Sequence, residues 1–373
     1  MKKREAIKII LFILPLLVTG CSMDLNRKEI DEIDLVRVLG IDYDNEEFVL
    51  SALYNSSQGA DPEGGSGESV VIKGRGRSVY EAFEDIKQKN KKSISLAHTG
   101  YFLIGYNAAS KGIDDCLDFL SRDETIKMES LIFVMKYMDA MEFIEKGIEN
   151  EQILHEDLEA ISQKQQEIIK RNDNNLVNIL NEMEQSYSAV LIPYILAEED
   201  SFSIAGYAVF KDFILADYLD EDTSSGVRFL KNTIRRYPLF LASEVGLLLT
   251  NINTKLSSSL DNNRVTIMIE MDYTSTIKEV TTNNDIFTFD MRNQLTEEKN
   301  QAVLEIISKP INYMMVTGND IIGLARLIEN NHVNEWKNMK ENWADLIYDI
   351  KYQYILHSKI DKSFIIGNER GVK

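Results

Sequence analysis

Cysteine is nearly absent from this chain, and histidine and tryptophan are rare. The 373 residues include two cysteines, Cys21 and Cys116, with four histidines and two tryptophans. Two cysteines allow at most one disulfide, so a disulfide-stapled scaffold is excluded and the fold must be held by its hydrophobic core. Cys116 lies near Ile113, Leu117 and Leu120 at helical spacing. We therefore expect Cys116 to be a buried small hydrophobic residue rather than a reactive thiol.

Basic charge is also scarce. The chain carries 41 Lys and Arg against 60 Asp and Glu, a net charge of −19. A surface of that sign repels the phosphate backbone of nucleic acids. We find no basic patch beyond the first eight residues, so no nucleic-acid partner is expected.

Metal-binding motifs are incomplete wherever they begin. His155 could start the helical zinc motif, but position 159, where the second histidine belongs, is Glu159. The acids that begin at Asp42 alternate as in a calcium loop, but Glu47 stands where that loop needs glycine and Leu53 where it needs glutamate. We expect no bound metal.

Catalytic and nucleotide-binding motifs are likewise missing. The sequence has no Gly-x-Ser-x-Gly elbow and no phosphate-binding Gly-x-x-x-x-Gly-Lys. Gly74-Arg75-Gly76 starts like a dinucleotide fingerprint, but Val79 replaces its third glycine. The sequence therefore predicts a protein without catalytic residues or a cofactor.

The N-terminus has the pattern of a lipoprotein signal peptide. A basic head precedes the apolar run 9–18, which spans about 15 Å as a helix and is too short to cross a bilayer. The run ends in Leu17-Val18-Thr19-Gly20-Cys21, with small residues directly before the cysteine. We expect cleavage after Gly20 and a diacylglycerol on the sulfur of Cys21. An ordinary secretory signal that ends at a cysteine, or a cytoplasmic protein with a buried N-terminus, remains an alternative.

Lipidation at Cys21 has two consequences. It would leave Cys116 without a disulfide partner. Cleavage would also remove four of the 41 basic residues and one of the 60 acidic ones, so the net charge would fall from −19 to −22. Such a protein is not held to anionic lipid by its overall charge, and an acyl anchor is needed instead. No later stretch reaches 18 apolar residues, so we expect no transmembrane helix in the mature chain.

Strand and helix patterns alternate through the first half of the chain, which predicts sheets covered by helices. The expected strands are 36–41, 47–54, 69–74, 101–104, 131–135, 189–196, 204–211, 214–218 and 265–270. The expected helices include one capped by Ser78, one at 108–120, one at 139–146 and a long one at 296–329 with a kink at Pro310. Glycine-rich 58–67 is expected to be a loop, and the Ser/Asn-rich 257–263 a linker.

The fold class that follows is mixed α+β. We predict a signal peptide at 1–20 and three domains, each a sheet packed with helices: an N-terminal domain at 21–196, a middle domain with a hairpin at 197–262, and a C-terminal domain with the long helix at 263–373.

Five sequence blocks, in order, resemble one family, the Ger(x)C lipoproteins, which are the C subunits of nutrient germinant receptors in endospore-forming bacteria. The blocks are Cys21 with Arg27-Lys28-Glu29-Ile30 and Leu39-Gly40-Ile41-Asp42; 74–82 with 97–105; 117–123; Gly206-Tyr207-Ala208-Val209-Phe210-Lys211-Asp212; and Asn319-Asp320-Ile321-Ile322-Gly323 followed by Trp336 and Trp343. Ser22-Met23 departs from the Trp-Asp that is frequent in the family.

The resemblance implies a three-domain protein without known catalysis. It would be tethered to the outer leaflet of the spore's inner membrane, beside an A subunit and a permease-like B subunit, and would assist assembly or signalling in germination. An extracytoplasmic solute-binding lipoprotein that acts alone is the alternative, although the alternation of strand and helix breaks after position 150. An anchored hydrolase is disfavoured by the missing nucleophile and metal ligands.

Overall fold

The structure is a computed structural model that describes residues 32–55, 68–171, 173–185, 187–199, 201–261, 264–281 and 288–361. Gly20, Cys21 and the expected loop at 58–67 lie outside these residues. Among the described residues, no helix is both long and apolar enough to cross a membrane.

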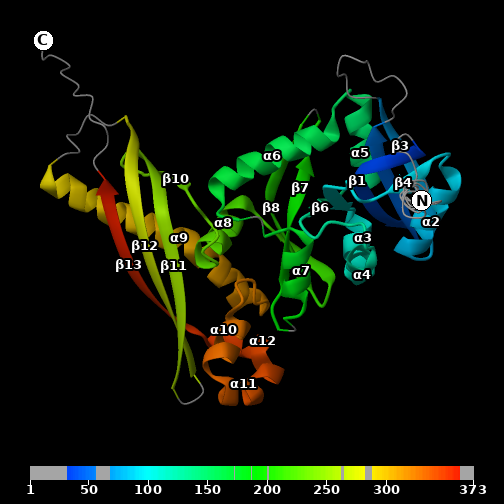
Figure 1. Ribbon diagram of the computed structural model, residues 1–373. Coiled ribbons are helices and arrows are strands. Elements are labelled where there is room, and N and C mark those ends of the chain that lie inside the picture. The colour runs from blue at the N-terminus through cyan, green and yellow to red at the C-terminus, as the bar shows by residue number, and fades with distance from the viewer. Residues whose placement is uncertain are drawn as a thin grey trace, which may run out of the picture.

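The first half of the chain forms a nine-stranded sheet (Figure 1). Its strands are β1 (Ile33–Asp44), β2 (Glu47–Asn55), β3 (Ser69–Gly76), β4 (Ser93–Ser95), β5 (Tyr101–Ile104), β6 (Leu131–Met135), β7 (Val190–Ala197), β8 (Phe202–Lys211) and β9 (Ile214–Leu219). Its helices are α2 (Val79–Lys89), α3 (Tyr106–Lys111), α4 (Asp114–Arg122), α5 (Ala140–Glu149), α6 (Leu154–Ile168) and α7 (Leu176–Met183).

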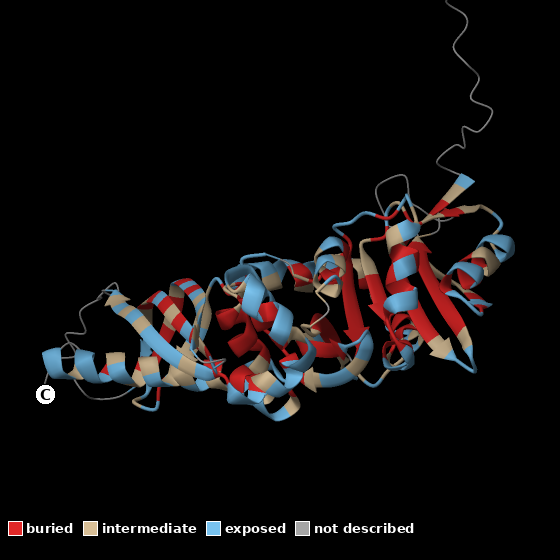
Figure 2. Ribbon diagram, turned by 90° about the horizontal axis from the view of Figure 1, so that it is seen from below, coloured by how far each residue is buried: buried red, intermediate tan, exposed pale blue. Residues whose placement is uncertain are grey.

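The strand order of this sheet is β3-β2-β1-β5-β6-β7-β8-β9, and β4 pairs with the start of β1. β1, β5, β6 and β7 run parallel, while antiparallel partners close both edges. β6 is buried along its whole length, as expected for a continuous apolar run inside a parallel sheet. Helices α2, α3, α4 and α7 pack on one face, and α5 and α6 on the other. Figure 2 shows the buried strands between them.

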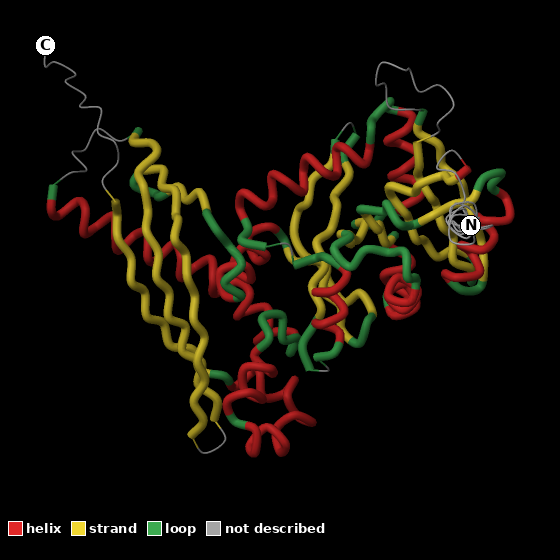
Figure 3. Tube along the Cα trace, viewed as in Figure 1, coloured by secondary structure: helices red, strands yellow, loops and turns green. Residues whose placement is uncertain are grey.

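The second half forms a four-stranded sheet in the order β10-β11-β12-β13. Its strands are β10 (Tyr237–Phe240), β11 (Val245–Asp261), β12 (Arg264–Val280) and β13 (Lys351–Asp361), and its helices are α8 (Glu221–Leu230), α9 (Phe289–Thr317), α10 (Leu324–Asn331), α11 (Val333–Met339) and α12 (Trp343–Leu346). β11 and β12 make a long antiparallel hairpin, and β13 pairs with β12 in parallel. The tube in Figure 3 shows the long helix α9 crossing behind this sheet, with the short helices gathered at one end.

The observed elements confirm the predicted mixed α+β fold and correct some local predictions. Residues 257–261 of the expected linker belong to a strand, because β11 continues to Asp261 and pairs with β12, while 262 and 263 lie outside the described residues. The helix expected over 296–329 is divided, since α9 ends at Thr317 and is capped by Gly318, whose φ of +70° is the left-handed conformation that glycine adopts readily. The helix expected at 108–120 is likewise two helices, with a break at Gly112, whose φ is +139°.

The predicted domain limits can be placed on these sheets. The limit at 196/197 lies between β7 and β8, which pair within the first sheet. The limit at 262/263 lies between β11 and β12, which pair within the second sheet. The division into three domains stays a prediction.

Candidate functional site

Asp42, at the end of β1, caps a helix that is distant in sequence. Its two carboxylate oxygens accept the backbone N–H groups of Ala140 at 2.7 Å and Met141 at 2.8 Å, at the start of α5. A Cβ on Gly105 would lie 1.8 Å from Asp42 Oδ1, so glycine is required there. Burial raises the pKa of Asp42 to about 7, although the two backbone hydrogen bonds oppose that rise. Asp42 of the first sequence block and Gly105 of the second therefore lie against each other at the start of α5, where they hold the fold together.

Tyr207, in the fourth block, is the centre of a buried polar network. Its hydroxyl donates to Asp173 Oδ2 at 2.7 Å and accepts from Arg228 Nε at 3.3 Å. Arg228 is 3% exposed and pairs through Nη1 with Glu221 at 2.8 Å. The buried guanidinium is thus satisfied by partners from β8 and α8, and the network fixes α8 against the first sheet.

Asp320, in the fifth block, joins the two halves of the chain. Its side chain is almost fully buried and accepts the N–H groups of Gly323 and Leu324 at 2.9 Å and of Ala325 at 2.7 Å. It also accepts the hydroxyl of Ser188 at 3.1 Å. A carboxylate at a helix N-terminus satisfies N–H groups that lack partners within the helix. Asp320 therefore caps α10 and fixes the segment that leads into β7.

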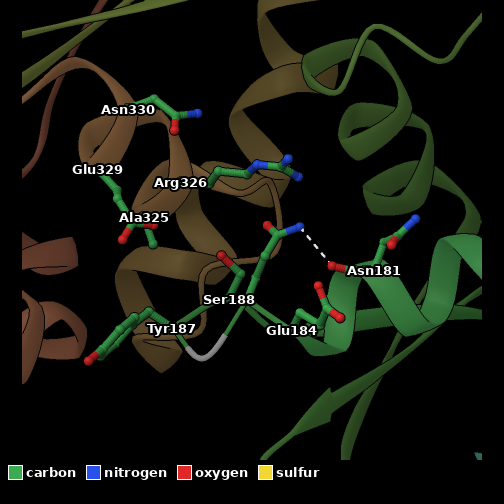
Figure 4. Close-up of a pocket in the computed structure, with 9 residues that line it drawn as sticks. Asn181, Glu184, Tyr187, Ser188, Ala325, Arg326, Glu329 and Asn330 are labelled. Carbon is green, nitrogen blue, oxygen red and sulfur yellow. Dashed lines mark hydrogen bonds between the residues drawn. The ribbon is translucent and has the colours of Figure 1, made fainter. Parts of the chain in front are cut away.

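A groove of about 500 Å³ lies beside this joint (Figure 4). We call it the junction groove, and it is lined by Asn181, Glu184, Gln185, Tyr187, Ser188, Ala325, Arg326, Glu329 and Asn330. One wall is the end of α7 with the segment after it, and the other is the exposed side of α10. Figure 4 shows Arg326, Glu184 and Ser188 around the same space.

Two smaller hollows adjoin the junction groove. One, of about 310 Å³, shares Ser188 and Arg326 with it and includes Arg171, Glu182 and Lys231. Lys231 and Glu182 form an ion pair at 2.5 Å in that hollow. The other, of about 180 Å³, lies between the turn after β8 and α12.

The chemistry of the junction groove is that of a binding surface. Its lining offers amides, hydroxyls and charges of both signs, which suit a polar ligand or a polar segment of a partner protein. Among the described residues, no group of three or more His, Cys, Asp and Glu side chains is placed to hold a metal ion. No local sequence signal predicts this groove, because its two walls come from segments about 140 positions apart.

The residues that the sequence singled out fall into three groups. Gly20 and Cys21, the expected cleavage and lipidation sites, lie outside the described residues. Cys116 is completely buried, and burial raises the pKa of its thiol to about 12, so the prediction of a packed, unreactive cysteine is confirmed. Trp336 and Trp343, which follow the fifth block, are core residues, each 3% exposed with ring centroids 5.3 Å apart.

Comparison with known proteins agrees with this architecture. The family model described as "Spore germination protein N-terminal domain" matches residues 26–197, and the one described as "Spore germination B3/ GerAC like, C-terminal" matches residues 205–363. The chain is 20% identical over 371 residues to YfkR of Bacillus subtilis (strain 168), which is named as a spore germination protein; the match covers 92% of this chain and 94% of YfkR.

The crystal structure of the GerBC protein is similar in fold. It superposes with a TM-score of 0.55 at 15% identity and covers 89% of this chain and 99% of GerBC. The two family models follow each other along nearly the whole described chain, and the resemblance inferred from the five blocks is confirmed. The chain belongs to the spore germination family of Ger(x)C proteins, the C subunits of germinant receptors.

Proposed function

We propose that this protein is a non-catalytic, membrane-anchored C subunit of a nutrient germinant receptor, which acts in germination by assembly or signalling with integral-membrane A and B subunits. The observation that carries the proposal is the pair of family matches at 26–197 and 205–363, directly behind a lipobox that ends at Cys21. The mature protein would lie on the outer leaflet of the spore's inner membrane.

The proposed anchor constrains where the protein works. The described part of the chain begins at Glu32, eleven residues after Cys21. A chain of eleven residues spans at most about 40 Å when fully extended. A diacylglycerol on Cys21 would therefore keep the start of β1 within that distance of the bilayer, close to the extracytoplasmic parts of membrane subunits.

The polar character of the junction groove supports binding and not bond-breaking. Buried carboxylates such as Asp42 and Asp320 are engaged in capping helices, and Arg228 is engaged with Tyr207 and Glu221. These groups hold the fold together, as expected of a subunit whose role is to present surfaces to neighbouring proteins.

Lipidation is tested first, on protein purified from sporulating cells. We expect the N-terminal peptide of the mature protein to begin at Cys21 with the mass of a diacylglycerol thioether, and the Cys21→Ala variant to leave the membrane fraction. An unmodified sulfur on membrane-bound protein would contradict the proposed anchor.

Assembly is tested by copurification from detergent-solubilised spore membranes. We expect A and B subunits to be recovered with the tagged chain, and spores that lack it to fail to germinate on at least one nutrient mixture. Normal germination of the deletion strain on every mixture would refute the role. Tight binding of a nutrient by the purified chain alone would instead favour the independent solute-binding lipoprotein.

A further inference from the structure

A basic region exists within this acidic molecule. Residues 69–93, which contain β3 and α2 and end at the first residue of β4, carry seven Lys and Arg against three Asp and Glu, in a chain with a net charge of −19. Four of the basic residues follow one another at the end of α2 and just beyond it: Lys87, Lys89, Lys91 and Lys92. We call them the lysine cluster. The expectation that no basic patch exists beyond the first eight residues is therefore wrong.

The topology places the lysine cluster where the described chain begins. β3 runs parallel to β1, α2 returns along the sheet, and β4 then pairs in parallel with the first residues of β1. Ser93 is the partner of Ile33 in that pairing, so Lys92 lies beside the first residues of β1. Figure 1 shows α2 and β4 together beside β1.

This end of the molecule is also the end that an anchor would hold. Ile33 follows Cys21 by twelve residues, a reach of about 40 Å at full extension. In both ribbon views the molecule is elongated, with α2 near one end and the second sheet at the other (Figures 1 and 2). A tether at Cys21 therefore brings the lysine cluster closer to the bilayer than the acidic remainder of the chain.

Three of the four lysines are exposed enough to contact a second partner, whereas Lys92 is 29% exposed and lies 3.8 Å from Asp34. Lys87 and Lys89 pair with Glu84 at 2.7 Å and Asp85 at 2.5 Å, but their side chains remain 41% and 53% exposed. Lys91 is exposed as well. Ion pairs in such exposed positions contribute little to stability, so their lysines can turn toward another anion at small cost.

We propose that the lysine cluster contacts the headgroups of anionic lipids and sets the orientation of the protein on the bilayer. The inference rests on the proposed lipid anchor. The net charge of the whole molecule opposes adsorption. A short basic cluster is nevertheless attracted to anionic lipid whenever the tether lets it approach within one Debye length, about 8 Å at physiological salt. The anchor would supply the attachment, and the cluster would select which end of the elongated body faces the membrane.

The experiment measures that orientation with the full lipidated chain in vesicles. A fluorescent donor is attached to Gln88→Cys, which lies within the cluster, while native Cys116 is buried and Cys21 is blocked by lipid. Energy transfer to a headgroup-labelled lipid is compared in vesicles of phosphatidylcholine alone and with 30% phosphatidylglycerol. We expect more transfer with the anionic lipid, and loss of that gain at high salt.

Two quadruple variants test whether the lysine cluster sets the orientation. Lys87→Gln, Lys89→Gln, Lys91→Gln and Lys92→Gln together should reduce the ratio of docked to undocked protein by about fivefold per lysine. The matched control replaces four exposed lysines of the second sheet, Lys255, Lys278, Lys351 and Lys359, by glutamine and should leave the ratio unchanged.

Equal transfer in the two kinds of vesicle, or an equal loss in both quadruple variants, would overturn the inference. The mass of the N-terminal peptide, determined on the same samples, separates this outcome from failure of the anchor. Lipidated protein that floats with vesicles but ignores anionic lipid would refute only the role of the lysine cluster.

Discussion

Lys299 is a buried cation without a carboxylate partner at contact distance in the described structure, and we expect its replacement to stabilise the protein. It lies on α9 with no solvent exposure. Its Nζ donates to Ser275 Oγ at 3.3 Å and lies 5.3 Å from the centroid of the Tyr273 ring. Burial lowers the pKa of Lys299 to about 8, and the more distant Asp361 only partly opposes that shift.

The size of the effect follows from proton linkage. The pKa of Lys299 falls from 10.5 to about 8 on folding, a difference equivalent to about 3 kcal/mol. The folded state disfavours the charged lysine, so the free energy of unfolding is reduced by this amount below pH 8 and recovers as the pH rises from 8 to 10.5. Lys299→Met removes the charge at similar volume and gives up one hydrogen bond. We therefore expect a net gain of about 1–3 kcal/mol at pH 7.

The assay is urea unfolding followed by the fluorescence of Trp336 and Trp343, which belong to the core that α9 helps to form. The gain should shrink toward zero by pH 10.5. Lys309→Met is the control, because Lys309 lies on the same helix with an exposed side chain paired to Asp222, and its loss should change stability by less than about 0.5 kcal/mol. A destabilised Lys299→Met at pH 7, or a gain that does not depend on pH, would refute the reasoning.

Three further predictions concern the sequence blocks. Burial raises the pKa of Asp42 from 3.8 to about 7, so this group should make the fold less stable as the pH rises from about 4 to 7. The stability of Asp42→Asn relative to the parent should increase over that range by about 4 kcal/mol in urea unfolding, and a constant difference would contradict the prediction. Gly206→Ala should lower the free energy of unfolding by about 1–3 kcal/mol, because a Cβ there would lie 2.2 Å from the Leu219 carbonyl oxygen. Gly100→Ala should leave stability nearly unchanged, because a Cβ there would have no heavy atom within 4 Å. Equal melting temperatures of the two variants would contradict this prediction. Asp320→Ala should lower the free energy of unfolding by about 2–4 kcal/mol and increase proteolysis near Ser188, while Asp345→Ala, at an exposed position of α12, should do neither.

Local sequence signals were enough to predict much of the first sheet. The predicted bounds of β5 and β6 are those observed, because short apolar runs flanked by polar residues are buried strands in this context. The cap at Ser78 is also confirmed, since its Oγ accepts the N–H of Glu81 at 3.1 Å. The Glu81 carboxylate, however, accepts the N–H of Arg77 and not that of Ser78, so the reciprocal half of the capping box is absent there.

The local predictions that failed depend on contacts between distant segments, and no short stretch of sequence contains that information. The end of β11 is rich in serine because alternate residues of that strand face solvent, and its identity as a strand depends on pairing with β12. The helix α5 was expected to stop at Gly147 but continues to Glu149. The junction groove and the lysine cluster's place beside β1 depend on which elements become neighbours, and that is decided by the topology of both sheets.

The two halves that the family models separate are joined through β7 and β8, whose opposite faces pack into two different cores. Alternate side chains of a strand point to opposite faces, so Ala208 and Phe210 pack in the core of the first sheet, while Tyr207 and Val209 pack in the core that contains Trp336. Separating the chain between 197 and 205 would expose an apolar face on each part. The same strands thus contribute side chains to both units. We therefore expect the two cores to unfold together, because a cut between β7 and β8 would uncover both.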